Sequence, residues 1–117
     1  MNIGDTAPPF DLPATDGTMH ALGAAPTAVV FTCNHCPYAL AWHDRLLDVA
    51  RDYSARGVQV LFVNPNDAES HPRDSFDAMK VRVEADGGWP VPYLRDGRVS
   101  PTPDPQDIRD AIRRTIR

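Results

Sequence analysis

The sequence predicts a single α/β domain with a mixed four-stranded sheet, helices on both faces and an N-terminal β-hairpin. The main observation is a long helical pattern between two apolar stretches rich in β-branched residues, 27–32 and 58–63. Such a strand–helix–strand unit implies parallel strands joined by a right-handed crossover. A second observation is the Asp96-Gly97 turn signal, which predicts a hairpin in the C-terminal part of the chain.

The first 25 residues are expected to form a hairpin that extends the main domain. Residues 10–12 and 19–22 alternate between apolar and polar side chains, and Asp16-Gly17 between them is a turn signal. We therefore expect one domain over residues 1–117, with 1–25 as its N-terminal extension.

The first helix is expected over residues 34–56, directly after a buried central strand at 27–32. Pro37 falls in its first turn, where a missing N–H group costs nothing, and Gly57 supplies the stop. A 3.6-residue repeat forms its buried stripe, which consists of Ala39, Leu40, His43, Leu46, Leu47, Ala50 and Tyr53. We interpret His43 as a histidine packed at the margin of the core.

A polar loop follows the second strand and consists of Asn64, Pro65, Asn66 and Asp67. Because neighbouring parallel strands end at the same edge of a sheet, this loop is expected near Cys33. Ordinary turn chemistry explains the same residues equally well.

Beyond this loop the pattern predicts helix, hairpin and helix. Asp74 or Ser75 can cap a helix that reaches residue 85, and 93–94 and 98–99 flank the Asp-Gly turn. A last helix is expected over residues 105–117, with its buried face formed by Ile108, Ala111, Ile112, Thr115 and Ile116. Its arginines are most simply a solvated face.

The two cysteines of the chain, Cys33 and Cys36, lie where the first strand ends and the first helix begins. Unpaired N–H groups at a helix start favour an anion, so we expect a lowered pKa for the first thiol. A structural disulfide is disfavoured because closing so short a loop removes little entropy from the unfolded chain. A metal site needs about four ligands and this pair supplies two. We therefore predict redox chemistry, with no metal and no organic cofactor.

The composition excludes some classes of binding partner. The net charge of −4 and the pI near 5.4 argue against nucleic acid or an anionic membrane as the main partner. No apolar run approaches the roughly 20 residues that span a bilayer, and no signal peptide is visible at the N-terminus. We expect a cytoplasmic protein, in which a single Cys-x-x-Cys pair more often serves catalysis than structure.

With a Cys-x-x-Cys pair at the first strand–helix junction, this order of elements resembles the thioredoxin fold. The opening Ile3-Gly4-Asp5-x-Ala7-Pro8-x-Phe10-x-Leu12 is similar to that of redoxin domains, which include TlpA-type oxidoreductases and alkyl hydroperoxide reductase/TSA proteins. The segments 31–38, 64–68 and 72–80 are similar to a bacterial branch of that group.

The resemblance ends near residue 96. Family members usually continue with another helix, a strand opened by a cis-proline, and only then a terminal hairpin and helix. This chain is shorter there, which leaves two explanations. Either Val91-Pro92 takes the place of the cis-proline, as the hairpin expected after Pro92 favours, or the chain lacks that element and its redox site is incomplete.

The resemblance implies a thiol-disulfide oxidoreductase acting on protein disulfides or dithiols, with an unidentified electron donor. Cys33 would attack and Cys36 would resolve the mixed disulfide, while Asn34, His35 and Pro37 would tune the couple. Three alternatives stay open: a peroxiredoxin-like thiol peroxidase, a thioredoxin-fold binding module that has lost turnover, and a Cys/His metal chaperone.

Overall fold

The computed structural model describes residues 2–99, and the expected helix over 105–117 lies outside them. Its elements are β1 (Asp11–Pro13), β2 (Met19–Ala21), β3 (Thr27–Phe31), α1 (Pro37–Ala55), β4 (Gln59–Asn66), the 3-10 turn η1 (Pro72–Asp74), α2 (Phe76–Ala85) and β5 (Tyr93–Val99). No helix in this part of the chain is long and apolar enough to cross a membrane.

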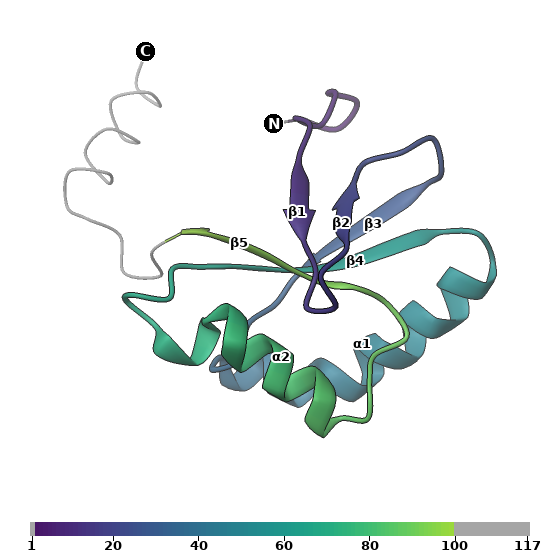
Figure 1. Cartoon of the computed structure of the whole chain (residues 1–117). Coiled ribbons are helices and arrows are strands. Elements are labelled where there is room, and N and C mark those ends of the chain that lie inside the picture. The colour runs from purple at the N-terminus through teal and green to yellow at the C-terminus, as the bar shows by residue number, and fades with distance from the viewer. Residues whose placement is uncertain (1, 100–117) are drawn as a thin grey trace, which may run out of the picture.

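The central sheet has the strand order β3-β4-β5, and both of its pairings are parallel. The strand–helix–strand prediction is confirmed, because α1 joins β3 to β4 and the two strands pair in parallel. The crossover through α1 leads from β3 to β4, and the crossover through α2 leads from β4 to β5, so both proceed in the same direction across the sheet. For that reason α1 and α2 cover one face, while the β1–β2 hairpin lies over the other (Figure 1).

Two apolar clusters fill the space between these layers. On the helix side, Phe62 of β4 and Tyr93 of β5 pack with Ala50 of α1 and Met79 of α2. On the hairpin side, alternate residues of the same strands pack under Ala14, namely Leu61, Val63 and Leu94. The alternation of a strand's side chains therefore sends β4 into both clusters, as expected for a strand buried on both faces.

The hairpin predicted around Asp96-Gly97 is wrong. Residues 93–99 form one strand, β5, which continues alongside β4 instead of turning back. Its register slips between the Asn64 and Asn66 pairings, and Gly97 within this irregularity has a φ of +69°. Gly97 thus forms a bulge in a parallel strand, a conformation that an L side chain rarely adopts. The described sheet is therefore three-stranded and parallel, where a mixed four-stranded one was predicted.

The predicted buried, central position of the first strand is also wrong. β3 is an outer strand of the described sheet, and Phe31 near its end is 69% exposed. β4 holds the central place, because β3 and β5 pair on either side of it. A continuous apolar run does not distinguish a central strand from an edge strand.

The N-terminal hairpin forms as predicted, with Leu12 opposite His20. It is attached to β5 by the Thr15 N–H, which donates to the Tyr93 carbonyl at 3.1 Å, and by a bridge between Ala14 and Leu94. His43 packs at the core margin as interpreted, with its Nε2 3.0 Å from Asp86 Oδ2 and its ring against Trp89.

Candidate functional site

The cysteine loop, residues 32–36, connects β3 to α1. The Thr32 N–H donates to the Val63 carbonyl at 3.0 Å and continues the sheet pairing by one residue. Cys36 is the N-cap residue of α1, and Pro37 occupies the first turn as predicted. Both thiols are free, and the Cys36 N–H donates to Cys33 Sγ at 3.3 Å. The loop thus places both cysteines at the N-terminal end of α1.

The two thiols differ in environment, but opposite to the prediction. Cys33 is only 8% exposed, and burial raises the pKa of its thiol despite hydrogen bonds from the Cys36 and His35 backbone. Cys36 is half-buried, and the backbone N–H groups of Ala39 and Tyr38 lower the pKa of its thiol. The helix begins at residue 37, three residues later than predicted, so its unpaired N–H groups serve Cys36.

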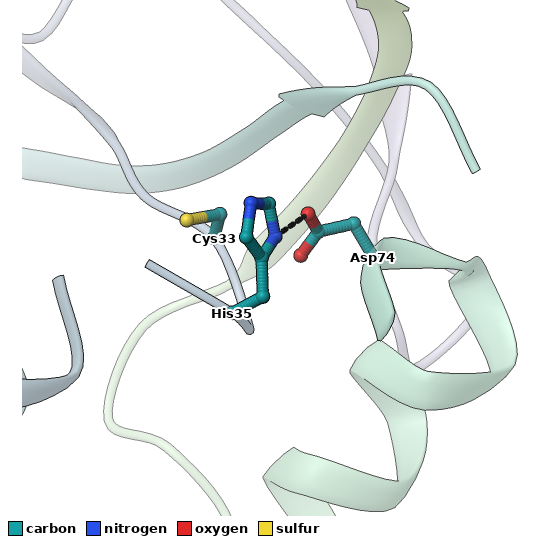
Figure 2. A group of neighbouring side chains, drawn as sticks. All are labelled: Cys33, His35 and Asp74. Atoms are coloured by element: carbon teal, nitrogen blue, oxygen red, sulfur yellow. Dashed lines mark hydrogen bonds and ion pairs between the residues drawn. The ribbon is translucent and has the colours of Figure 1, made fainter. Parts of the chain in front are cut away.

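Asp74 lies at the centre of the polar site, although the sequence suggested only a helix cap. It is 1% exposed, and its Oδ1 accepts from the Asn34 backbone N–H at 2.6 Å and from Asn64 Nδ2 at 3.1 Å. Its Oδ2 accepts from Asn66 Nδ2 at 3.0 Å. The same oxygen accepts from His35 Nδ1, as Figure 2 shows. Burial alone would raise the pKa of Asp74, but these hydrogen bonds and the pairing with His35 hold it below its ordinary value.

Asn34 fixes the cysteine loop to its surroundings. Its side-chain oxygen accepts from the Tyr93 hydroxyl at 2.7 Å and from Arg82 Nη1 at 2.9 Å, and its Nδ2 donates to the Arg73 carbonyl. Arg82 Nη1 also donates to the Cys33 carbonyl at 2.9 Å. These contacts give Asn34 a structural place in the site.

His35 is held on two sides. Its Nδ1 bonds to Asp74, and its ring stacks on His71 with centroids 4.4 Å apart and planes 8° from parallel. The ring therefore has one fixed edge toward Asp74 and one covered face.

The loop predicted near Cys33 reaches the site indirectly. Asn64 and Asn66 bind Asp74, although both belong to β4. Asp67 instead shapes its own turn, accepting from the Glu69 N–H and from the Ser70 hydroxyl. No described contact of Pro65 or Asp67 reaches the cysteine loop, so only the two asparagines of the loop join the site.

The candidate cis-proline is wrong, because no peptide bond in residues 2–99 is cis. Pro92 leads directly into β5, and its carbonyl accepts from the Phe62 N–H at 3.1 Å. The strand that follows is extended and parallel to β4, and a trans bond suits this entry.

Cys33, His35 and Asp74 could together offer a sulfur, a nitrogen and an oxygen that lie within 4.8 Å of one another. Both oxygens of Asp74 already accept two hydrogen bonds each, which leaves this carboxylate poorly suited to a cation. The arrangement suits a held proton better than a held metal ion.

Sequence reasoning missed Asp74, Arg82, Tyr93 and His71 as parts of the site. The sequence offers Asp74 or Ser75 as the cap of α2, and the structure has Ser75, whose hydroxyl accepts from the Ala78 N–H. The capping pattern does not indicate that Asp74 belongs to the cysteine site. Arg82 on α2 lies 49 residues from Cys33, and Tyr93 on β5 lies 59 residues from Asn34. No local spacing signals such contacts.

The fold and the thiol pair define a thioredoxin-like redoxin domain. The sequence pattern of the AhpC/TSA family matches residues 3–100, and the chain therefore belongs to that family. No curated protein matches the chain significantly.

Several solved structures are similar to this fold. An uncharacterized conserved protein from Geobacillus kaustophilus is 40% identical, with a TM-score of 0.75, over 81% of this chain and 52% of that one. A peroxiredoxin-like protein from Aquifex aeolicus (19% identity, TM-score 0.63) matches 84% of this chain and 54% of its own. A structure from Neisseria meningitidis assigned as a thioredoxin is 20% identical, with a TM-score of 0.60. The match covers 94% of this chain and 89% of that one.

The chain spans about half the length of the first two of these structures. The two likenesses at 19% and 20% identity show the fold alone. Family membership supports a thiol-based redox function in general terms.

Proposed function

We propose that this protein is a thiol-disulfide oxidoreductase that uses Cys33 and Cys36 on protein disulfides or dithiols. The observation that carries the proposal is the hydrogen bond from the Cys36 N–H to Cys33 Sγ at 3.3 Å. It holds the Cys33 thiol against the backbone of Cys36 at the start of α1. The two free thiols there have unlike environments, so each can serve a different step.

Cys36 is the attacking thiolate in this proposal, which reverses the order expected from the sequence. Its lowered pKa and partial exposure favour the thiolate at an accessible position, whereas Cys33 is buried with a raised pKa. The Cys36 thiolate attacks a substrate disulfide, forms a mixed disulfide and releases one substrate thiolate. Cys33 then attacks the Cys36 sulfur, forms the Cys33–Cys36 disulfide and releases the second thiolate. An external dithiol reductant returns both cysteines to thiols.

The surface beside Cys36 suits a polypeptide substrate. Tyr38 and Leu40 in the first turns of α1 are exposed, and so is Val81 of α2. Leu40 and Val81 line a shallow hollow of about 540 Å³ together with Asn34, Arg73, Ala78 and Arg82. A shallow hollow lined by both apolar and polar side chains fits an extended peptide segment better than a small polar molecule.

A direct test uses the two serine variants. If Cys36 attacks, Cys33→Ser accumulates a mixed disulfide with a disulfide-containing protein such as insulin, whereas Cys36→Ser accumulates none. Trapping through Cys33 alone would overturn the assignment of roles. The wild-type protein with dithiothreitol should accelerate insulin reduction, and the double serine variant should not.

A thiol peroxidase is the second candidate, favoured by the AhpC/TSA family and the likeness to a peroxiredoxin-like protein. It predicts rapid loss of free thiol with hydrogen peroxide and little insulin reduction. A binding module without turnover predicts neither reaction.

We place the protein in the cytoplasm, where one Cys-x-x-Cys pair more often serves catalysis than structure.

A further inference from the structure

We propose that His35 and Asp74 form a pair that accepts the Cys33 proton in the resolving step, with His35 as the acceptor and Asp74 as its positioning residue. The inference rests on the proposed function, since it concerns the second step of that exchange. The pairing of His35 with Asp74 is not visible from the sequence, where the two residues lie 39 positions apart.

The geometry brings three groups together. Cys33 Sγ, a ring nitrogen of His35 and a carboxylate oxygen of Asp74 lie within 4.8 Å of one another. Figure 2 shows Asp74 bonded to one edge of the His35 ring, while the opposite edge is turned toward Cys33. Because Nδ1 donates to the carboxylate, Nε2 is left as the free acceptor.

Asp74 is well suited to hold the ring when the ring becomes charged. Its two oxygens accept four hydrogen bonds in a buried site, which keep the carboxylate ionised and fixed. The fixed negative charge of Asp74, next to the Nδ1–H group, stabilises an imidazolium. It also selects the neutral tautomer that accepts a proton at Nε2. His71, stacked on the ring, holds its plane.

Cys33 needs such an acceptor because it is buried as a thiol. The groups that face it from the neighbouring elements cannot take its proton. The backbone N–H groups of Cys36 and His35 are donors, and Arg82 of α2 is a permanent cation bonded to the Cys33 carbonyl. Tyr93 of β5 is buried, which raises the pKa of its hydroxyl, and that hydroxyl donates to Asn34.

The proposed step balances in protons and electrons. In the mixed disulfide of Cys36, the Cys33 proton moves to His35 Nε2 while Cys33 sulfur attacks Cys36 sulfur. The Cys33–Cys36 bond forms, the bond between Cys36 and the substrate sulfur breaks, and the substrate leaves as a thiolate. His35 then returns the proton to that thiolate, so the substrate is reduced and the cysteine pair is oxidised.

The test measures the two steps separately with dithionitrobenzoate, a small aromatic disulfide that releases a coloured thiolate at each step. The first release depends on reagent concentration, and the second is a unimolecular resolution by Cys33. We expect Asp74→Asn and His35→Gln to slow the second phase by roughly 100-fold, the lower end of the range for general acid–base catalysis. Asp77→Asn, the same change at an exposed position of α2, should leave it unchanged.

A second measurement separates proton transfer from simple electrostatics. The charge of Asp74 raises the pKa of Cys33, so Asp74→Asn should lower that pKa. Alkylation of Cys33 against pH in a Cys36→Ser background measures this directly. A more acidic Cys33 with slower resolution supports the pair, whereas unchanged or faster resolution overturns it.

Rescue keeps the proposal decidable if Asp74→Asn does not fold. His35 is partly exposed, so His35→Ala leaves the buried carboxylate and its asparagine partners in place. Added imidazole should restore the second phase in His35→Ala, and no restoration would overturn the role of His35. Loss of insulin reduction with a normal second phase would instead count against the proposed function alone.

Discussion

The Tyr93 hydroxyl, at the start of β5, donates a hydrogen bond of 2.7 Å to the Asn34 side chain in the cysteine loop. The same hydroxyl accepts from Asn64 Nδ2 of β4 at 3.1 Å. One buried phenol therefore connects the loop of the thiols with two strands of the sheet. The position of β5 alongside β4 thus decides the shape of the redox site.

Tyr93→Phe is expected to destabilise the protein by about 1–3 kcal/mol, because it leaves a donor of Asn64 and an acceptor site of Asn34 without their buried partner. Urea unfolding followed by circular dichroism measures the change. Tyr38→Phe removes the same hydroxyl from an exposed side chain and should have little effect. Equal losses in the two variants would contradict the role given to Tyr93.

Phe31 and Phe62 test the strand order. Phe62→Ala should cost about 3–5 kcal/mol, because β4 is central and this side chain is 1% exposed. Phe31→Ala should change the free energy of unfolding by only about 0.5 kcal/mol, because β3 is an outer strand and Phe31 is mostly exposed. Similar costs at the two positions would show that β3 is covered on both faces after all.

The sequence predicts the local parts of this fold well, because their signals are local. Pro37 and Gly57 mark the two ends of α1, and alternation marks the N-terminal hairpin. The junction that carries Cys33 and Cys36 is recognisable for the same reason. Each of these signals depends on the conformation of a few adjacent residues.

The arrangement of the strands depends on tertiary contacts and is not predictable in the same way. Asp96-Gly97 is a strong hairpin signal, yet pairing with the long strand β4 keeps β5 extended and makes Gly97 a bulge. Asp74 likewise acquires its place only when β4, the cysteine loop and η1 meet. The helix α1 begins three residues later than predicted, so the backbone N–H groups of its first turn lower the pKa of the Cys36 thiol.

The reactivity of the two thiols provides a further prediction. Cys36 should be alkylated before Cys33 when the reduced protein meets iodoacetamide at mildly acidic pH, because its pKa is lowered and the Cys33 pKa is raised. Each unit of difference in pKa changes the thiolate fraction about 10-fold. Peptide mass spectrometry identifies the labelled residue. In urea the preference should largely disappear, and faster labelling of Cys33 in the native protein would contradict the geometry.

Asp74 is expected to link stability to acid pH. Its pKa is lowered by folding from an ordinary 3.8, so the ionised carboxylate stabilises the native state above that value. This contribution is lost as the pH falls from 3.8 through the lower folded pKa, where protonation removes acceptors from Asn34, Asn64 and Asn66. Asp74→Asn should therefore cost about 3 kcal/mol at neutral pH. The gap between wild type and variant should narrow as the pH falls below about 4. Unfolding free energies from urea titrations across this pH range measure the gap, and Asp77→Asn provides the matched control at an exposed aspartate. A gap that stays constant down to strongly acidic pH would show that the charge of Asp74 does not stabilise the fold.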